Sequence, residues 1–304
     1  MREFDLLEHI YAANARLSSR VIIPPGDDMA QVELRSTKLL AAVDQLVAGR
    51  HIDLATTPLP LVGRKAVTRS LSDIAAMAGR PVATLVAATL PPDFGAERAE
   101  TLFDAMRVTC EQYDSPLVGG DIAFHCRPEH PLVCSVTVLA EPSWAVAVTR
   151  GGAQVGDDVY VTGRLGGAVT GDGGGRHLTF EPRIAEAIEL LGHLTLRLHA
   201  MIDISDGLGR DAGHIADQSG VTLVLDAAAV PCTPGIPWRE AVSGGEDYEL
   251  CFTATGRVPL KLGDVPVARI GIVAPRRGGD GGGVVFREGG CEIPGAAMGW
   301  QHES

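Results

Sequence analysis

The order of helix-like and strand-like segments constrains this chain more than any other feature of its sequence. Short apolar stretches typical of strands alternate with longer amphipathic stretches typical of helices. The pattern stops at Glu141-Pro142 and starts again after residue 150. This order predicts a mixed α/β fold with two domains, at residues 1–145 and 146–304.

Apolar periodicity places the expected elements along the chain. Before the interruption we expect helices at residues 4–17, 64–78 and 96–113, and strands at 38–43, 84–90 and 131–140. After it we expect helices at 182–199 and 206–218, and strands at 157–162, 221–225, 248–254 and 267–273. Gly79 and Pro81 are interpreted as the stop signals of the helix at 64–78. The glycine-rich stretches at 171–175 and 276–283 are interpreted as loops.

Charge and hydropathy exclude several classes of protein. The chain has 26 Lys and Arg against 38 Asp and Glu, a net charge of −12, which argues against a nucleic-acid partner. Its 45% hydrophobic and 21% charged residues are typical of a globular chain. The longest apolar stretches, such as residues 82–90, are too short to span a bilayer, and the acidic start does not resemble a signal peptide. We therefore expect a cytoplasmic protein without a membrane partner.

Cysteine and glycine usage add one expectation and one question. The six cysteines show no CxxC pair and no zinc-site spacing, so we expect reduced core thiols at Cys110, Cys126, Cys134, Cys232, Cys251 and Cys291. Glycine is abundant, with 37 of 304 residues, and it is clustered. Such clusters are either flexible linkers or places where a ligand needs bare backbone.

Several aspartates lie beside Gly or Ser where a strand or turn is expected to end: Asp27, Asp28, Asp44, Asp73, Asp121, Asp203 and Asp206. Mg²⁺ takes oxygen ligands, usually one or two carboxylates together with water and substrate phosphates. Phosphates favour glycine-rich backbone and helix N-termini. No P-loop and no GxGxxG motif after a strand is present. The pattern therefore favours a Mg²⁺–phosphate enzyme that is not of the P-loop type.

Each of these aspartates also has a simpler interpretation. Asp is common in turns and at helix N-caps. Asp73 is placed to pair with Arg69 at i, i+4 on a helix surface. Ser205 or Asp206 is placed to cap the helix expected after them.

The motifs together are more specific than any one of them. In chain order they are Gly26-Asp27-Asp28-Met29-Ala30, residues 44–51, 63–66 leading to 71–77, Gly119-Gly120-Asp121, Thr149-Arg150, residues 203–208 and residues 243–250. Their order and spacing resemble the thiamine-monophosphate kinase family, within the superfamily that includes aminoimidazole ribonucleotide synthetase and selenophosphate synthetase. The resemblance runs over nearly the whole chain.

The resemblance implies a two-domain aminoimidazole ribonucleotide synthetase-like fold that forms a homodimer through strands of the N-terminal domain. It implies that ATP, held over several Mg²⁺ ions, passes its γ-phosphoryl group directly to thiamine monophosphate. The implied Mg²⁺ ligands are Asp28, Asp44, Asp73, Asp121, Asp203 and Asp206. The implied ATP contacts are Gly120, Asp121, Arg150 and Ser205, and the implied contacts to the thiamine side are His51, Glu246 and Trp300.

The chemistry of these residues suits the implied roles. A loose phosphoryl-transfer transition state needs alignment and charge neutralisation, which Mg²⁺ and the forked guanidinium of Arg150 supply. Trp300 is suited to stack on a thiazolium or pyrimidine ring, or simply to pack on its own domain. His51 without a ligand and Glu246 as a residue that only orients its loop are the alternatives for the other two contacts.

The chain departs from the family pattern at three places. Ala42-Val43 stands where hydroxyl residues usually precede the second-motif aspartate, Ile122-Ala123 follows Gly-Gly-Asp where Thr is usual, and Ser70 stands where Asn is common. The number of bound metals and the turnover therefore stay open.

Two other functions compete with the kinase. One is another enzyme of the superfamily with a different acceptor. The chain has no Cys before Cys110, unlike selenophosphate synthetases, and it ends in His302-Glu303-Ser304 where hydrogenase-maturation relatives end in Cys. The other is a binding protein that keeps affinity for nucleotide or thiamine phosphate without turnover.

Overall fold

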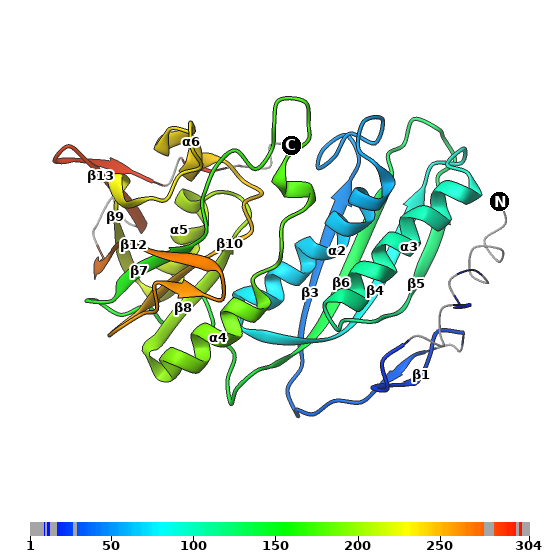
Figure 1. The fold of residues 1–304 in the computed structure, drawn as a ribbon, viewed down its shortest axis with the longest axis horizontal. Helices are drawn as coiled ribbons and strands as arrows, with labels where there is room; N and C mark the ends of the chain where they lie inside the picture. Colours follow the sequence, from blue (N-terminus) through cyan, green and yellow to red (C-terminus); the bar gives the residue numbers. More distant parts are fainter. Residues whose placement is uncertain are drawn as a thin grey trace. The chain divides into compact units, whose positions relative to one another are not determined.

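The computed structural model describes residues 9, 11–12, 17–26, 29–276, 283–295 and 298–299. The chain divides into two compact units, drawn with their sequence colours in Figure 1. The N-terminal unit comprises Met1–Ile74, Gly79–Pro142 and Gly171–Gly174, and the C-terminal unit comprises Ala75–Ala78, Ser143–Thr170 and Gly175–Ser304. Each unit contains a sheet and helices, so the predicted mixed α/β class is confirmed.

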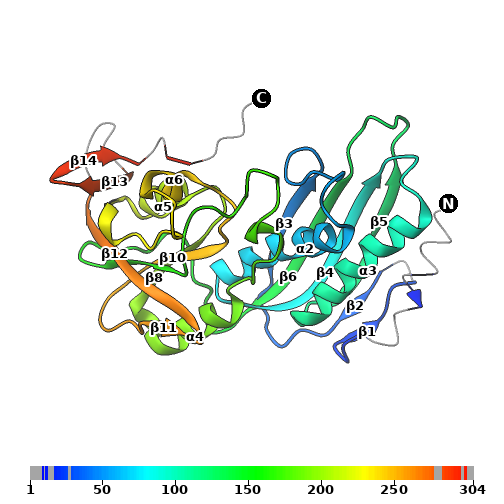
Figure 2. The same cartoon turned by 45° about the horizontal axis from the view of Figure 1, so that its top comes forward.

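A four-stranded sheet forms the centre of the N-terminal unit. Its strand order is β3 (Leu40–Val47), β6 (Val133–Pro142), β4 (Gly79–Leu90) and β5 (Leu117–Phe124). β4 and β5 run parallel, and the other neighbours are antiparallel. Helices α2 (Leu59–Ala76) and α3 (Ala96–Gln112) lie side by side across one face of this sheet (Figures 1 and 2). A short hairpin, β1 (Val21–Ile23) and β2 (Gln31–Val32), precedes it.

Helix α2 forms where the apolar spacing predicts it, with different ends. Val67, Leu71 and Ile74 are buried along one side, as an amphipathic helix requires. The helix begins at Leu59, five residues before the expected start. Gly79 and Pro81 do follow its end, but both lie inside β4 and pair with β6. The first residues of β4 therefore also act as the helix stop.

A larger sheet forms the centre of the C-terminal unit. Its strand order is β14-β13-β9-β12-β7-β10-β8, with β11 paired to β12, and only the β9–β13 pair is parallel. The strands are β7 (Asp158–Thr162), β8 (Leu198–Ile204), β9 (Val221–Asp226), β10 (Glu249–Ala254), β11 (Lys261–Leu262), β12 (Val265–Pro275), β13 (Gly283–Glu288) and β14 (Cys291–Pro294). The helices are α4 (Ile184–Leu194), α5 (Leu208–Ser219) and α6 (Trp238–Ser243), with 3-10 turns η2 (Arg176–Leu178), η3 (Thr195–Arg197) and η4 (Ala227–Ala229).

Helix α5 positions the functional loops of this unit, because it packs directly on the sheet. It contacts β8, β9 and β13, and its Leu208 and Ile215 are fully buried against the strands. Ile202 and Ile204 of β8 and Phe286 of β13 complete the same core.

The structure corrects several expected boundaries. The helix expected at 182–199 is wrong beyond Leu194, because Thr195 has a positive φ of 52° and β8 begins at Leu198. Asp44 and Asp121 do not end their strands but lie within β3 and β5, and Asp73 lies within α2. Most of the helix expected at 4–17, and residues 277–282 of the glycine-rich loop, lie outside the described residues.

The six cysteines are free, but they are not all in the core. Cys110, Cys134 and Cys251 are buried, and burial raises the pKa of each thiol to about 12. Cys126 and Cys291 are exposed, so the expectation of core thiols is wrong for these two. Among the described residues, no helix has the length and apolar character needed to cross a membrane.

Candidate functional site

Two predicted metal ligands, Asp44 and Asp73, lie in the same layer of the N-terminal unit, between β3 and α2. Asp44 shares a strand face with the buried Leu46 and pairs with Val136 of β6. Ser70 of α2 donates a hydrogen bond of 3.0 Å to the Val136 carbonyl oxygen, and Asp73 is one turn further along the helix. This hydrogen bond places Ser70 of α2 beside the strand pair that carries Asp44.

The Gly120-Asp121 pair lies on the edge strand β5. Gly120 pairs with Val86 of β4, and a Cβ atom on Gly120 would lie 1.8 Å from the Val86 carbonyl oxygen. Only glycine fits at this position, which explains one member of the glycine excess. Gly120 belongs to the same cross-strand row as Asp44, so the side chain of Asp121, one residue on, is directed to the opposite face.

A cavity of about 700 Å³ brings the first and fourth motifs together within this unit. Gly26, Met29, Gly120 and Asp121 contribute to its wall, together with apolar residues of the sheet. Asp28, the predicted ligand between Gly26 and Met29, lies outside the described residues. Asp121 therefore shares a cavity with Gly26 and Met29, on the other face of the sheet from Asp44.

His51 follows β3 in a turn that fixes its ring. Its Nδ1 accepts a hydrogen bond of 2.9 Å from the Val47 N–H, which leaves the proton of the neutral ring on Nε2. Its carbonyl oxygen accepts a hydrogen bond of 2.8 Å from Nζ of Lys65, whose side chain is fully buried in α2. No functional role is predicted for Lys65 from the sequence. The signal that marks Lys65 in the sequence is its place on the apolar side of the helix, next to Val62 and Ala66.

The C-terminal unit places Asp203, Ser205 and Asp206 on one turn between β8 and α5. Asp203 is almost fully buried at the end of β8. The backbone N–H groups of Ser205, Asp206 and Gly207 all donate to Oδ2 of Asp211, at 2.9, 2.9 and 3.1 Å. Burial raises the pKa of Asp211 to about 8, and the neighbouring Asp203 and Asp206 add to this.

Residues 244–248 form a second loop, which is bonded to this turn. The N–H groups of Glu246 and Tyr248 donate to the carbonyl oxygens of Ser205 and Ile204, both at 2.7 Å. Glu246 and Tyr248 have positive φ angles of 68° and 51°, a conformation that costs about 1–3 kcal/mol for each residue that is not glycine. The hydrogen bonds to Ser205 and Ile204 offset part of that cost. They also join the turn before α5 and the loop at residues 244–248 into one hydrogen-bonded structure.

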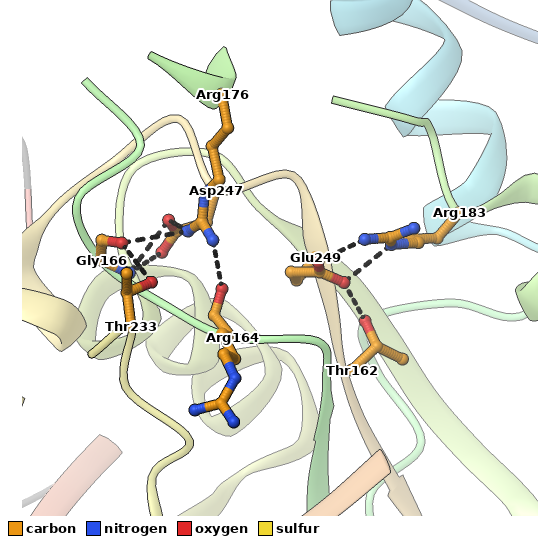
Figure 3. Close-up of polar contacts among 8 residues, drawn as sticks. All are labelled: Thr162, Arg164, Gly166, Arg176, Arg183, Thr233, Asp247 and Glu249. Atoms are coloured by element: carbon orange, nitrogen blue, oxygen red, sulfur yellow. Dashed lines mark hydrogen bonds and ion pairs between the residues drawn. The ribbon is translucent and has the colours of Figure 1, made fainter. Parts of the chain in front are cut away.

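Residues 246–249 contain three acidic side chains. Two of them, Asp247 and Glu249, fix this segment through hydrogen bonds to other parts of the unit (Figure 3). Both carboxylate oxygens of Asp247 accept the Gly166 N–H, at 3.0 and 3.1 Å, and Arg176 pairs with the same carboxylate. Arg176 also donates to the carbonyl oxygens of Arg164 and Gly166, at 2.8 and 3.2 Å. Burial raises the pKa of Asp247 to about 6 against the lowering effect of Arg176.

Glu249 is the other anchor, at the start of β10. Arg183 holds it with two hydrogen bonds of 2.8 and 2.6 Å, and the Thr162 hydroxyl donates a third of 2.7 Å. A Cβ atom on Gly163 would lie 2.1 Å from the Glu249 carboxylate, so this position also requires glycine. No motif in the sequence marks Arg176 or Arg183, and the sequence analysis missed both.

Glu246 is the member of the motif that does not serve as a buried anchor. Its side chain is partly exposed, 3.7 Å from Nδ1 of His177 and 3.3 Å from the Tyr248 hydroxyl, which donates to it. Phe180 stacks on Tyr248 at 3.9 Å between ring centroids. The loop therefore presents a carboxylate beside an aromatic pair.

Arg150 lies at the other end of α5. Its carbonyl oxygen accepts a hydrogen bond of 3.3 Å from Ser219, whose hydroxyl also accepts the N–H groups of Gly152 and Ala153. The Arg150 side chain is exposed. Burial, together with Arg150 and Arg210, lowers the pKa of His214 in the middle of the helix.

Trp300 lies outside the described residues.

The described residues contain no group of three or more His, Cys, Asp or Glu side chains that together fit a metal ion. Mg²⁺ is often held by only one or two carboxylates, with substrate phosphates completing its shell. The pairs Asp44 with Asp73 and Asp203 with Asp206 match that donor set. The residues present therefore fit Mg²⁺ bound together with a phosphate ligand.

Comparison with known proteins identifies the family. Residues 26–142 match the family described as AIR synthase related protein, N-terminal domain. The chain is 31% identical over 283 residues to a thiamine-monophosphate kinase of Rhodopirellula baltica, covering 85% of each chain. It is 33% identical over 297 residues to the Escherichia coli enzyme of that name, covering 87% of each.

Solved structures agree with this result. The crystal structure of thiamine-monophosphate kinase from Stenotrophomonas maltophilia is 30% identical, with a TM-score of 0.78, and covers 94% of this chain and 96% of its own. A structure described as AaThiL complexed with AMPPCP and TMP is also 30% identical, with a TM-score of 0.73 and coverage of 100% and 99%. The chain therefore belongs to the thiamine-monophosphate kinase family.

Proposed function

We propose that this chain transfers the γ-phosphoryl group of ATP to thiamine monophosphate, giving thiamine diphosphate and ADP. The observation that carries the proposal lies in the C-terminal unit. There, backbone hydrogen bonds join the segment that carries Asp203, Ser205 and Asp206 to the loop that carries Glu246. A relative complexed with AMPPCP and TMP matches the chain over its full length and supports both ligands. The reaction is proposed to take place in the cytoplasm, where ATP is available as the donor.

The acidic residues are proposed to hold Mg²⁺ ions in separate places. Asp44 with Asp73 and Asp203 with Asp206 are proposed as two ligand pairs, and Asp28 and Asp121 are proposed as further ligands. Bound Mg²⁺ supplies charge neutralisation for the phosphate oxygens. Within the N-terminal unit, the division of Asp44 and Asp121 between two faces of the sheet favours more than one ion.

The remaining residues are proposed to bind the two substrates. Gly120 offers bare backbone, Arg150 an exposed guanidinium fork and Ser205 a hydroxyl for the ATP phosphates. His51, Glu246 and Trp300 are proposed to contact the thiamine side. The Glu246 carboxylate suits the cationic thiazolium ring, because opposite charges attract more strongly in a partly buried site. The loose transition state needs no strong general base.

A direct assay tests this function. We expect the purified chain, incubated with ATP, Mg²⁺ and thiamine monophosphate, to form thiamine diphosphate, measured by chromatography with fluorescent detection. Removing Mg²⁺ with a chelator is expected to stop the reaction. Thermal stabilisation by an ATP analogue and thiamine monophosphate without any product would instead identify a binding protein. Product from another phosphate acceptor alone would identify a different enzyme of the superfamily.

The face of the N-terminal sheet opposite helices α2 and α3 is proposed to form the homodimer. Val43 on this face of β3 is 61% exposed, and the cavity beside it is lined by Leu85 of β4 and Leu139 of β6. Apolar surface of this kind is stabilised by a second copy of the same strands.

Sedimentation measures this dimer directly. We expect a mass of twice the 31.9 kDa chain, and we expect Val43→Arg to shift the protein towards the monomer because it places a charge in the apolar contact. The matched control is Val155→Arg, at a position 58% exposed in the C-terminal unit, which should leave the mass unchanged. A monomeric wild-type chain would contradict the proposal.

A further inference from the structure

Asp211 lies in the first turn of α5 and faces backward along the chain, towards the turn that carries three predicted site residues. A helix is usually capped by the side chain of the residue before it. Here Gly207 precedes the helix and offers no side-chain cap, and the Asp211 side chain bonds instead to the backbone of the turn before the helix. One of its oxygens, Oδ2, accepts the N–H groups of Ser205, Asp206 and Gly207.

These three hydrogen bonds determine the path of the backbone between β8 and α5. Three successive N–H groups that converge on one atom leave the turn little freedom, and Asp211 is only 3% exposed. A Cβ atom on Gly207 would lie 3.0–3.1 Å from three carbonyl oxygens of residues 242–244, so the turn is also tightly enclosed. The directions of the Ser205 and Asp206 side chains follow from this backbone.

The influence of Asp211 extends to the second loop. Ser205 and Ile204, next to the anchored N–H groups, accept the hydrogen bonds from Glu246 and Tyr248. The hydrogen bond from the Glu246 N–H to the Ser205 carbonyl oxygen helps to hold the positive φ of Glu246. Asp211 therefore supports the turn that carries Asp203, Ser205 and Asp206 and, through it, the loop that carries Glu246.

We propose that Asp211 is a positioning residue for the Mg²⁺–nucleotide site, and that it acts as a hydrogen-bond acceptor and not as a charge. This inference rests on the proposed function. The three donors are neutral backbone groups, for which an amide oxygen in the same place is also an acceptor. A negative charge on Asp211 would lie close to the carboxylates of Asp203 and Asp206. It would add to their negative charge and would not neutralise it.

Two substitutions separate the acceptor from the charge. Asp211→Asn keeps an oxygen at the same distance from the backbone and removes the charge. Asp211→Glu keeps the charge but moves the acceptor by about 1.5 Å. The measurement is the dissociation constant of a non-hydrolysable ATP analogue with Mg²⁺, by calorimetry, together with the melting temperature of each variant.

We expect Asp211→Asn to bind the analogue within about threefold of wild type, and Asp211→Glu and Asp211→Ala to bind at least about tenfold more weakly. The matched control is Asp157→Ala. Asp157 is fully buried, accepts the Gln154 N–H at 2.8 Å and contacts His199, at the opposite end of β7 and β8 from Asp203. This control should lower the melting temperature without weakening the binding of the ATP analogue.

The outcomes distinguish the inference from the proposed function. Equal affinity in all Asp211 variants, or an Asn variant as weak as the Glu variant, would overturn the positioning role. An equal loss of affinity for the analogue in Asp157→Ala would overturn the positioning role as well, because the loss would then follow from lower stability alone. If Asp211→Ala does not fold, the Asn and Glu pair still decides. A wild-type chain that binds no analogue would overturn the proposed function, and the inference with it.

Discussion

Replacing Asp44 by Asn is expected to lower the rate of thiamine diphosphate formation by about 10²–10³-fold while the protein stays folded. Asn has nearly the same shape as Asp, so the packing between β3 and α2 is kept. The amide cannot supply the negative charge that balances Mg²⁺ next to Asp73. The chain has Ala42-Val43 in place of the hydroxyl residues of the family pattern, so few side chains nearby can replace the lost ligand. Steady-state kinetics and a thermal melt measure the two effects.

Asp53→Asn is the matched control for this substitution. Asp53 is an exposed carboxylate of the same unit, it accepts the Ala55 N–H at 2.9 Å, and it has no predicted role. The activity of this control should stay within about twofold of wild type, as for most exposed substitutions. Wild-type turnover in Asp44→Asn would contradict the ligand role of Asp44. A large loss of stability would show that Asp44 serves the fold instead.

The parts of the fold that could be predicted are those with a strong local period. The helices α2, α3 and α5 and the strands β4, β6, β9, β10 and β12 lie near their expected positions, because their sequences show a helical or alternating apolar period or, for β9 and β10, a short continuous apolar run. β8 was missed, since it follows α4 after only the short turn at residues 195–197 and its apolar residues continue the helical run. β5 was missed because Gly119 and Gly120 have no side chain to show alternation.

The candidate site divides in the same way. Residues 203–206 and Glu246 were predicted from motifs, and the structure joins the turn and the loop that carry them by backbone hydrogen bonds. The groups that hold those loops in place, Asp211, Arg176 and Arg183, were not predicted. Their role depends on contacts between residues 4 to 71 positions apart, which no sequence motif marks. A sequence motif marks the presented side chain, whereas its support comes from the tertiary structure.

Asp247→Ala is expected to lower the stability of the C-terminal unit by about 3 kcal/mol. The side chain of Asp247 has no exposed surface, and its removal leaves the Gly166 N–H and Arg176 without their carboxylate. Breaking a buried ion pair costs about 3–5 kcal/mol, and the Arg176 side chain is one-third exposed, so water offsets part of its loss and the lower end applies. Glu246 and Tyr248, on either side, lose the anchor that holds their positive φ angles. Urea unfolding, followed by a probe in this unit, measures the change.

Two further variants give this experiment its controls. Asp247→Asn keeps an acceptor for the Gly166 N–H and should lose less stability than the Ala variant, because only the charge on Arg176 is unmatched. Glu292→Ala breaks the exposed Arg287–Glu292 pair of the same unit, at 3.1 Å, and should cost no more than about 1 kcal/mol. Equal losses from Asp247→Ala and Glu292→Ala would mean that Asp247 does not anchor the loop. In that case the positive φ angles of Glu246 and Tyr248 would have to be held by their hydrogen bonds to Ser205 and Ile204 alone, and the Asp211 variants would show the larger effect on Glu246.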